Sequence, residues 1–471
     1  MATRCIYSAA VCFLCTLTNF VSGKETGFPK SLTEAKALWI ETTTSLFHGN
    51  GLAVELCAFV VEWPVITAVC ATAIALLLYY GYQLFFIPLN RVRRLEDVGY
   101  AHDPSMGKRD IANMVRRRRA VGNIPPVYPN GWFGLMESFD LAKGQVKEVN
   151  ALGVHLAVFR DEEGKAHVVN AYCPHLGANL AVGGKVVGNC IECPFHAWRF
   201  RGEDGKCTNI PAAEKVPDIA RVKSWKVREL NGWVYVWYHA EGDEPYWFPP
   251  EIEEITKGEW TYRGRTEHIV NAQIQEIPEN GADVAHLPQV HGPFMGAGTD
   301  LRYMWAKMWT FVEHRWNASW EAFQPPEGHI AQMSVGHKLW LCGMHMSMLD
   351  MDVKAKQIGP AFVYLSMDCG IFGKGVIIHN LLPVGPITQK LIHNIYVQSR
   401  MPTFAAKFYM MAEAIQVERD IMIWNNKRYE NKPIFARSKE DSTIAKHRRW
   451  YSQFYSEHSP RLSFQEDSLS W

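Results

Sequence analysis

Cysteine and histidine residues occur in two short groups between Cys173 and Trp198. The segment CPHLGA carries Cys173 and His175, and the segment CPFHAW carries Cys193 and His196. Thiolates and imidazoles bind transition metals, and pairs of them on separate loops can enclose a single centre. The spacing therefore predicts one metal centre that needs both groups.

Two kinds of centre would accept these four ligands. A zinc ion binds two cysteines and two histidines in one shell. A Rieske [2Fe-2S] cluster takes the two cysteines on one iron and the two histidines on the other. The surrounding residues favour the cluster, because both segments resemble the ligand loops of Rieske proteins, where proline and glycine shape tight turns. Cys190 lies close to Cys193, but only Cys193 keeps the expected spacing to His196, so we assign Cys190 a structural role.

A second pair of histidines lies in the segment ENGADVAHLPQVH, where His286 and His291 follow Asp283. On an unbroken helix, residues five apart are rotated by about 140° and do not share a face. Pro288 ends or distorts such a helix, which would let the two imidazoles converge. With one carboxylate they would form the two-histidine, one-carboxylate triad that leaves positions open on a non-haem iron(II) for dioxygen and substrate.

The two motifs, in this order, resemble those of the Rieske non-haem iron oxygenases over about residues 126–455. The resemblance implies an α+β fold in which a β-rich Rieske domain precedes a helix-grip (START-like) catalytic domain with an antiparallel sheet. It also implies that Asp283 links the mononuclear iron site to a cluster histidine of a neighbouring subunit. A head-to-tail homotrimer would follow, since a heterologous interface can close into a ring.

The third iron ligand must be a carboxylate from further along the chain. In the segment ERDIMIW, Asp420 lies four residues before Trp424. This offset resembles the ligand-bearing helix of steroid-hydroxylating members of the family, and we expect Asp420 to be the ligand. Glu413 and Glu418 are the competing candidates. Asn280 would either hydrogen-bond near the iron site or cap a helix.

The elements that must position these residues fall into two bodies. Between 127 and 243 the short runs VHLAVFR, AHVVNAY and WVYVWYH are rich in β-branched and aromatic residues and predict a β-rich Rieske domain. The catalytic domain is expected at 244–455, with one long helix over Thr403–Tyr429, because this segment has no glycine or proline. Residues 456–471 form a tail.

The first 126 residues have a different pattern. Residues 1–23 predict a hydrophobic segment or a signal peptide. Residues 63–90 carry no charge and predict a transmembrane helix. A basic linker at 91–126 follows, whose arginines place the C-terminal side in the cytosol by the positive-inside rule. We expect a catalytic body that is anchored to a membrane, that of the endoplasmic reticulum.

Composition excludes some partners. The chain of 471 residues has a net charge of +1, which gives no electrostatic footprint for nucleic acid. Its 11 cysteines lack the spacing of a disulfide framework and favour a reducing compartment. The other histidines have no spacing that supports a role. The apolar segments 308–323 and 375–384 would line a substrate pocket or pack in the core.

The chain resembles the Neverland-type cholesterol 7-desaturases of animals in three features. These are the membrane segment, the stretch NGADVAHLPQVH and the tail HRRWYSQFYSEHSPRL. The resemblance implies dioxygen-dependent conversion of cholesterol to 7-dehydrocholesterol in ecdysteroid-type hormone biosynthesis. It also implies that a separate reductase supplies electrons from NAD(P)H. Two alternatives are a Rieske steroid or lipid hydroxylase, and a membrane-anchored Rieske electron-transfer protein in which His286 and His291 are structural.

Overall fold

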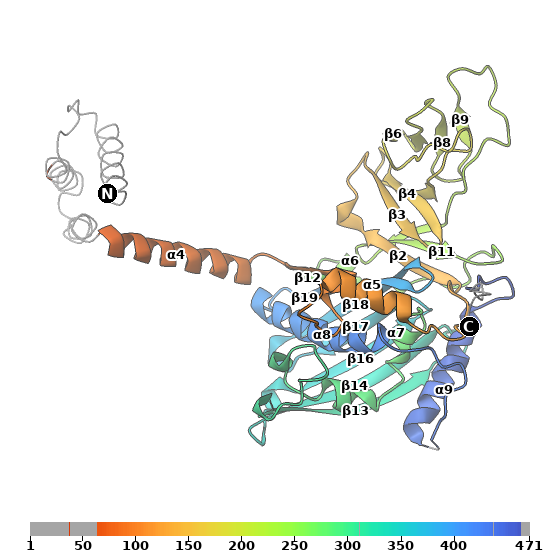
Figure 1. Ribbon diagram of the computed structural model, residues 1–471. Helices are drawn as coiled ribbons and strands as arrows, with labels where there is room; N and C mark the ends of the chain where they lie inside the picture. Colours follow the sequence, from red (N-terminus) through yellow and green to blue (C-terminus); the bar gives the residue numbers. More distant parts are fainter. Residues whose placement is uncertain (1–36, 38–63, 310, 437, 463–471) are drawn as a thin grey trace. The chain divides into compact units, whose positions relative to one another are not determined.

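The computed structural model describes residues 37, 64–309, 311–436 and 438–462. The chain divides into two compact units, Met1–Phe86 and Ile87–Trp471 (Figure 1). The hydrophobic segment expected at 1–23 and the tail beyond residue 462 lie outside the described residues.

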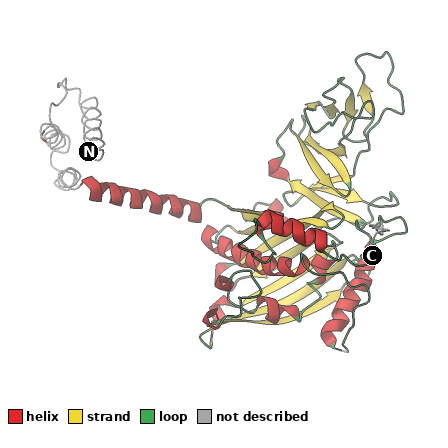
Figure 2. Cartoon of the chain, viewed as in Figure 1, coloured by secondary structure: helices red, strands yellow, loops and turns green. Residues whose placement is uncertain are grey.

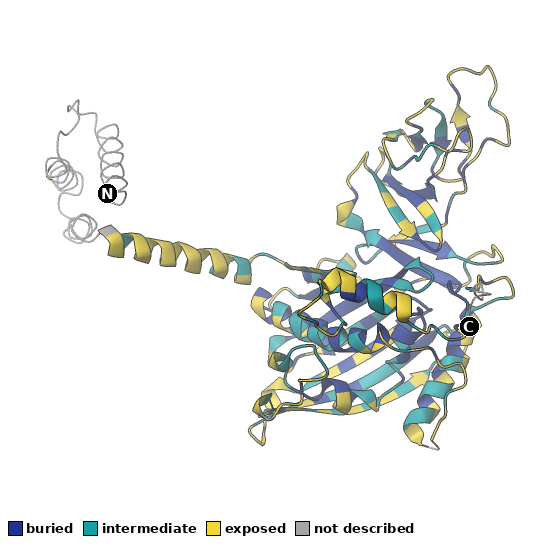
Figure 3. Ribbon diagram, in the orientation of Figure 1, coloured by how far each residue is buried: buried dark blue, intermediate teal, exposed yellow. Residues whose placement is uncertain are grey.

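The first unit contains the helix α4, Pro64–Phe85 (Figure 2). Most residues of this helix are exposed (Figure 3). Within the described ranges, it is the one helix long and apolar enough to cross a membrane. The helix ends earlier than the predicted boundary at residue 90, because the chain changes to a strand just after Pro88, which has no N–H to continue the helical hydrogen bonds.

The β-rich module consists of three small antiparallel sheets, with strand orders β10-β11-β2, β3-β4-β5 and β6-β7-β8-β9. The three predicted runs are confirmed as the strands β4, β5 and β11. The strands of the module are β2 (Gly131–Glu137), β3 (Val146–Ala151), β4 (Val154–Arg160), β5 (Ala166–Asn170), β6 (Lys185–Val187), β7 (Cys190–Glu192), β8 (Arg199–Arg201), β9 (Cys207–Asn209), β10 (Val227–Leu230) and β11 (Trp233–Tyr238).

The catalytic body is built on one nine-stranded sheet with the order β1-β12-β19-β18-β17-β16-β14-β13, and β15 pairs with β14. Its strands pair antiparallel except for β1, which runs parallel to β12. The sheet is therefore mixed, and the expectation of an antiparallel sheet is corrected at this edge. The strands are β1 (Leu89–Arg93), β12 (Trp260–Val270), β13 (Val312–Ala322), β14 (Ile330–Leu341), β15 (Met344–His345), β16 (Met351–Ile358), β17 (Phe362–Asp368), β18 (Lys374–Gly385) and β19 (Thr388–Gln398).

The segment expected to be a basic linker carries regular structure. It contains most of β1 and the helix α5, Lys108–Arg118, which buries Ile111 and Ala112. Arg91 and Arg93 of β1 bind Glu418 at 2.7 and 3.2 Å. From the local sequence alone, a run of arginines indicates a solvated segment. The expectation failed because the buried carboxylate that binds these two arginines lies more than 300 residues away along the chain.

Helices cover the sheet. The predicted long helix is confirmed as α8, Thr403–Trp424, which lies against β12 and β19 (Figure 1). It ends before Tyr429 because the side chain of Asn425 binds backbone groups of Val98 and Asn271. The other helices of this body are α6 (Glu253–Thr256), α7 (Glu276–Glu279) and α9 (Lys439–Tyr451).

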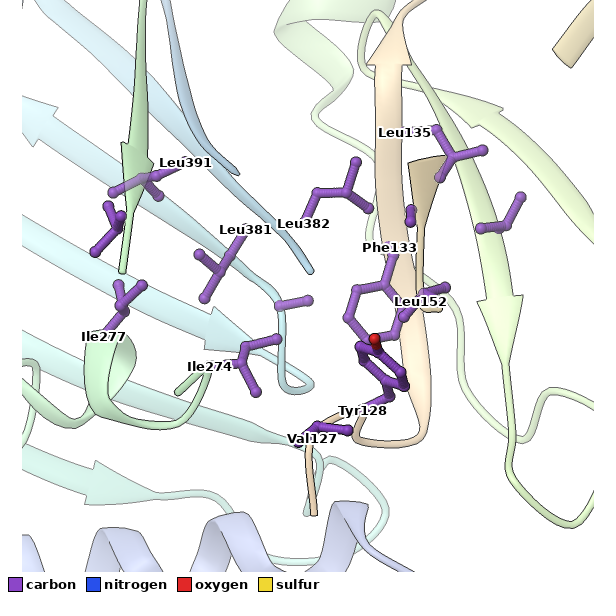
Figure 4. Packing of buried hydrophobic residues seen from close by; sticks show 14 of the residues in the cluster. Val127, Tyr128, Phe133, Leu135, Leu152, Ile274, Ile277, Leu381, Leu382 and Leu391 are labelled. Carbon is purple, nitrogen blue, oxygen red and sulfur yellow. The ribbon is translucent and has the colours of Figure 1, made fainter. Parts of the chain in front are cut away.

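One continuous hydrophobic core joins the β-rich module to the catalytic body. Phe133 and Leu135 of β2 belong to the same buried cluster as Leu381 of β18 and Leu391 of β19 (Figure 4). Burying each such side chain stabilises the fold by roughly 2 kcal/mol. The two bodies are thereby held as one unit, and the sites below share one framework.

Candidate metal centres

The first predicted centre lies on two loops of the β-rich module. Cys173 and Cys193 are buried, and their thiols are hydrogen-bonded to each other. His175 and His196 are exposed, and their ring centroids lie 4.7 Å apart. The structure therefore brings all four predicted ligands together, with the thiols on the inner side and the imidazoles at the surface.

The two loops have the same backbone conformation. The N–H of Gly177 donates to Cys173 O at 2.9 Å, and the N–H of Ala197 donates to Cys193 O at 3.1 Å. Both turning residues are left-handed, with φ of 75° at Gly177 and 55° at Ala197. This conformation costs a residue with a Cβ about 1 kcal/mol, so the second loop holds it at some expense.

The backbone of the first loop favours a thiolate. Burial raises the pKa of the Cys173 thiol to about 11, while N–H groups of His175 and Leu176 bind its sulfur and act in the opposite direction. A metal ligand must lose its proton, and these N–H groups stabilise the charged form. Cys190 binds Asn189 Oδ1 at 3.3 Å instead of the cysteine pair, which agrees with a structural role.

These residues fit a two-iron cluster better than a zinc ion. A zinc ion needs its ligand atoms gathered around one point. Among the described residues, two groups have ligand atoms that all lie within 4.8 Å of one another, and neither contains these four side chains. A thiol pair on one side and an imidazole pair on the other is the donor set of a Rieske cluster.

Trp198 lies beside a predicted cluster ligand, and the sequence analysis gave it no role. Its indole lies parallel to the His175 ring at an angle of 7°, and the ring centroids are 4.6 Å apart. The Phe195 and His196 rings are also close, with centroids 3.9 Å apart, but their planes are tilted by 38°. Both aromatic residues are part of the CPFHAW motif. Their position next to a predicted ligand in the sequence could have indicated that they contact the ligand histidines.

The second predicted centre is assembled as a triad. His291 Nε2 lies 3.2 Å from His286 Nε2 and 3.4 Å from Asp420 Oδ2. Asp420 Oδ1 is buried and has no hydrogen-bond partner. Two imidazoles and a carboxylate with such an unsatisfied oxygen fit a mononuclear iron(II).

The local backbone explains why the histidines converge. Residues Leu287–His291 form a π-helical turn with Pro288 in its first positions. In a π-helix the hydrogen bonds join residues five apart, so residues with this spacing lie above one another. The backbone carbonyl of Asp283 accepts a hydrogen bond from His286 Nδ1. This bond places the ring proton on Nδ1 and leaves Nε2 free for a metal.

Arg419 holds the segment that follows His291. Its buried guanidinium donates to Val290 O at 3.2 Å, to Pro293 O and Phe294 O at 3.0 Å each, and to Gly298 O at 3.0 Å. Burial lowers the pKa of Arg419 to about 10, which leaves the side chain charged at neutral pH. One helix, α8, thus supplies the carboxylate of the triad at position 420 and a support for the histidine turn at position 419.

The competing carboxylates are engaged elsewhere. Glu418 binds Arg91, Arg93 and His268. Glu413 forms a separate group with His379 and His393, two histidines to which the sequence analysis gave no role. Asp420 is therefore the helix carboxylate that reaches the histidine pair. Asn280 is the C-terminal cap residue of α7 and also lines the cavity described next.

A cavity of about 250 Å³ opens beside the triad. His286, His291 and Asp420 line it, and most of its other lining side chains are apolar. The two apolar segments that were expected to line a pocket or pack in the core both contribute to the cavity wall. Segment 308–323 supplies Trp316 and Trp320, and segment 375–384 supplies Leu381. A cavity with apolar walls and a few convergent polar groups is typical of a small-molecule site.

Two family models match the chain. The Rieske [2Fe-2S] domain matches residues 131–226, and the 3-ketosteroid 9alpha-hydroxylase C-terminal domain matches residues 236–455. The first match ends at residue 226, and the second begins at residue 236, within β11 of the β-rich module.

Curated relatives match most of the chain. The cholesterol 7-desaturase of Xenopus laevis is 52% identical over 84% of this chain and 87% of its own length. That of Hemicentrotus pulcherrimus is 48% identical over 89% of each chain. That of Caenorhabditis elegans is 41% identical over 87% of this chain and 96% of its own.

Solved structures share the fold. NdmA of Pseudomonas putida, as the QL mutant with caffeine, has a TM-score of 0.52 at 15% identity and covers 72% of this chain and 97% of its own. Dicamba monooxygenase bound to 3,6 dichlorosalicylic acid has a TM-score of 0.50 at 15% identity and covers 70% of this chain and 98% of its own. At this identity the likeness concerns the fold alone.

Proposed function

The chain belongs to the cholesterol 7-desaturase family of Rieske non-haem iron oxygenases, and we propose that it converts cholesterol into 7-dehydrocholesterol. The reaction balances when cholesterol, dioxygen, NAD(P)H and a proton give 7-dehydrocholesterol, NAD(P)⁺ and two waters. The electrons from NAD(P)H would come through a separate reductase.

The observation that carries this proposal is the apolar cavity onto which the triad faces. When bound, the mononuclear iron supplies dioxygen activation and the cluster supplies single electrons. His286, His291 and Asp420 would hold the iron. The apolar walls would bind a sterol skeleton by excluding water from its surface. The bond from His286 Nδ1 to the carbonyl of Asp283 keeps the ring oriented throughout.

The test is to express the full chain in cells that lack sterol 7-desaturation, to feed labelled cholesterol and to analyse the extracted sterols by mass spectrometry. We expect labelled 7-dehydrocholesterol from the wild-type chain and none from His286→Ala. No sterol product from a chain with both centres assembled and a competent reductase would contradict the proposal.

A second candidate is steroid hydroxylation, which the match to a 3-ketosteroid 9alpha-hydroxylase domain favours. The same experiment separates it from desaturation, because a hydroxylase would yield a labelled hydroxysterol. A pure electron carrier would retain its redox function in His286→Ala, and the clustering of His286, His291 and Asp420 argues against that reading.

We also propose that electrons cross between subunits of a head-to-tail trimer by way of Asp283. The exposed imidazoles of His175 and His196 support this route, since a neighbouring subunit can reach them. Coexpression of Cys173→Ser with Asp420→Ala tests it: mixed trimers should recover activity that neither variant has alone. Absence of recovery would contradict transfer between subunits.

We further propose that α4 spans the membrane of the endoplasmic reticulum with the catalytic body in the cytosol. The apolar length of α4 and the arginines that follow it support this topology. Protease protection of intact microsomes tests it, because added protease should digest the catalytic body while a luminal location would protect it.

A further inference from the structure

A second group of two histidines and one carboxylate lies in the same cavity as the triad. His379 of β18 and His393 of β19 are direct cross-strand partners, and their rings stack with centroids 3.7 Å apart. Glu413 of α8 accepts a hydrogen bond from His393 Nδ1 at 2.8 Å and lies 3.5 Å from His379 Nε2. All three side chains line the cavity.

The group has hydrogen-bonding capacity that the chain leaves unused. Nε2 of His379 and Nε2 of His393 are both buried and have no hydrogen-bond partner. A buried polar atom without a partner costs free energy, so such atoms are normally satisfied by the fold, by water or by a ligand. Burial lowers the pKa of His379 to about 3 and raises that of Glu413, so the imidazole of His379 is neutral.

The position of the group relative to the triad follows from the helix that they share. Glu413 and Asp420 are seven residues apart on α8. Seven residues make almost two turns, so both face the same side and lie about 10 Å apart along the helix axis. Val417, which lies between them on this face, also lines the cavity. The two polar groups thus line the cavity at different levels of α8.

We propose that His379, His393 and Glu413 bind the hydroxyl group of the sterol substrate, while the triad faces the carbon that loses hydrogen. The inference rests on the proposed function and adds the residues that recognise the substrate. In a sterol, the hydroxyl and the reacting carbon lie on adjacent rings of one rigid skeleton. Fixing the hydroxyl therefore also fixes the reacting carbon relative to the iron site.

The chemistry of the group matches a hydroxyl, which both donates and accepts a hydrogen bond. His393 holds its proton on Nδ1 for the bond to Glu413, so its Nε2 carries a lone pair that accepts the hydroxyl hydrogen. His379 with its proton on Nε2 can donate to the hydroxyl oxygen. One acceptor and one donor side by side are what an alcohol needs.

The test compares two substrates in microsomes that contain the full chain and its reductase. Cholesterol carries the hydroxyl, and cholest-5-ene has the same skeleton without it. A site built to hydrogen-bond a hydroxyl rejects an analogue that lacks it, so we expect the wild-type kcat/KM for cholesterol to exceed that for cholest-5-ene by about 10² or more.

Two variants should weaken this preference about tenfold. In Glu413→Gln and His379→Leu, kcat/KM for cholesterol should fall about tenfold through KM, while the value for cholest-5-ene stays unchanged. His268→Asn is the matched control, because His268 binds Glu418 between the same sheet and helix without lining the cavity. This control should keep the wild-type preference for cholesterol.

Each outcome bears on one claim. If the variants lower kcat/KM equally for both substrates, the group has a structural role and the inference is wrong. Metal analysis that finds an additional ion, lost in Glu413→Gln, would make the group a metal site and overturn the inference as well. If the wild-type chain leaves cholesterol unchanged, the proposed function itself fails, and the inference fails with it.

Discussion

Trp198 and His175 lie face to face, with ring centroids 4.6 Å apart and an angle of 7° between their planes. The stack immobilises an imidazole that is otherwise exposed. It therefore controls the orientation of one ligand of the predicted cluster.

The stack predicts a defect in electron transfer for Trp198→Leu. Aromatic pairs contribute about 1 kcal/mol beyond their buried area, so we expect the reduction rate of the cluster to change roughly fivefold. Electron paramagnetic resonance should still detect the reduced cluster, with altered line positions. Phe139→Leu, an exposed aromatic residue of the same module, is the control, and an unchanged spectrum in Trp198→Leu would contradict the prediction.

The triad predicts the metal content of variants. Asp420→Ala should reduce the iron content from about three to about two atoms per chain, because the mononuclear iron loses its carboxylate while the cluster remains. Glu413→Gln, on the same face of α8, should keep about three. Metal analysis combined with the visible absorption of the cluster checks both numbers. Equal iron content in the two variants would contradict the assignment of Asp420 as an iron ligand.

The four hydrogen bonds of Arg419 predict a structural and a metal-binding effect. Arg419→Met leaves buried carbonyls without donors and should lower the free energy of unfolding by roughly 4 kcal/mol. Arg419→Lys keeps the charge but cannot span all four carbonyls. The affinity of the Arg419→Lys protein for the mononuclear iron should fall about 10- to 100-fold. Iron titration of the apoprotein measures this loss, and wild-type affinity in Arg419→Lys would refute the role.

The environment of Glu418 predicts how stability depends on pH. Burial raises the pKa of Glu418, but hydrogen bonds from His268 and Arg91 outweigh it and lower the pKa from 4.5 to about 2. A carboxylate with a depressed pKa stabilises the fold fully above its unfolded pKa, and this contribution shrinks as the pH falls from 4.5 towards 2. The difference in unfolding free energy between wild type and Glu418→Gln should be constant from pH 7 to 5 and decrease below pH 4.5. Chemical denaturation of the full chain in detergent at each pH tests this, and a difference that grows on acidification would contradict it.

Motifs with short spacing could be predicted from the sequence because the chemistry of the ligands limits their arrangement. Cys173, His175, Cys193 and His196 occupy loops whose turns repeat the same hydrogen bonds. The convergence of His286 and His291 also followed from a local feature, the distortion at Pro288.

Contacts between distant segments could not be predicted in this way. The partners of His379 come from the next strand and from α8, so no local spacing shows the group around it. Arg91 and Arg93 were assigned to a linker for the same reason, since Glu418 becomes their partner only in the folded chain. Sheet register, which places such residues side by side, depends on tertiary packing.

The parallel pairing of β1 with β12 has a consequence for the synthesis of the chain. Leu89 pairs with Gly264, so about 175 residues separate the two strands. At ribosomal rates of 5–20 residues per second, β1 waits roughly 10 to 35 seconds for its partner. During this interval its edge is open to wrong pairing, and the charges of Arg91 and Arg93 disfavour association with another chain. The same arginines bind Glu418 once α8 has been synthesised. Their charges are then neutralised, at a stage when β12 already covers the edge of β1.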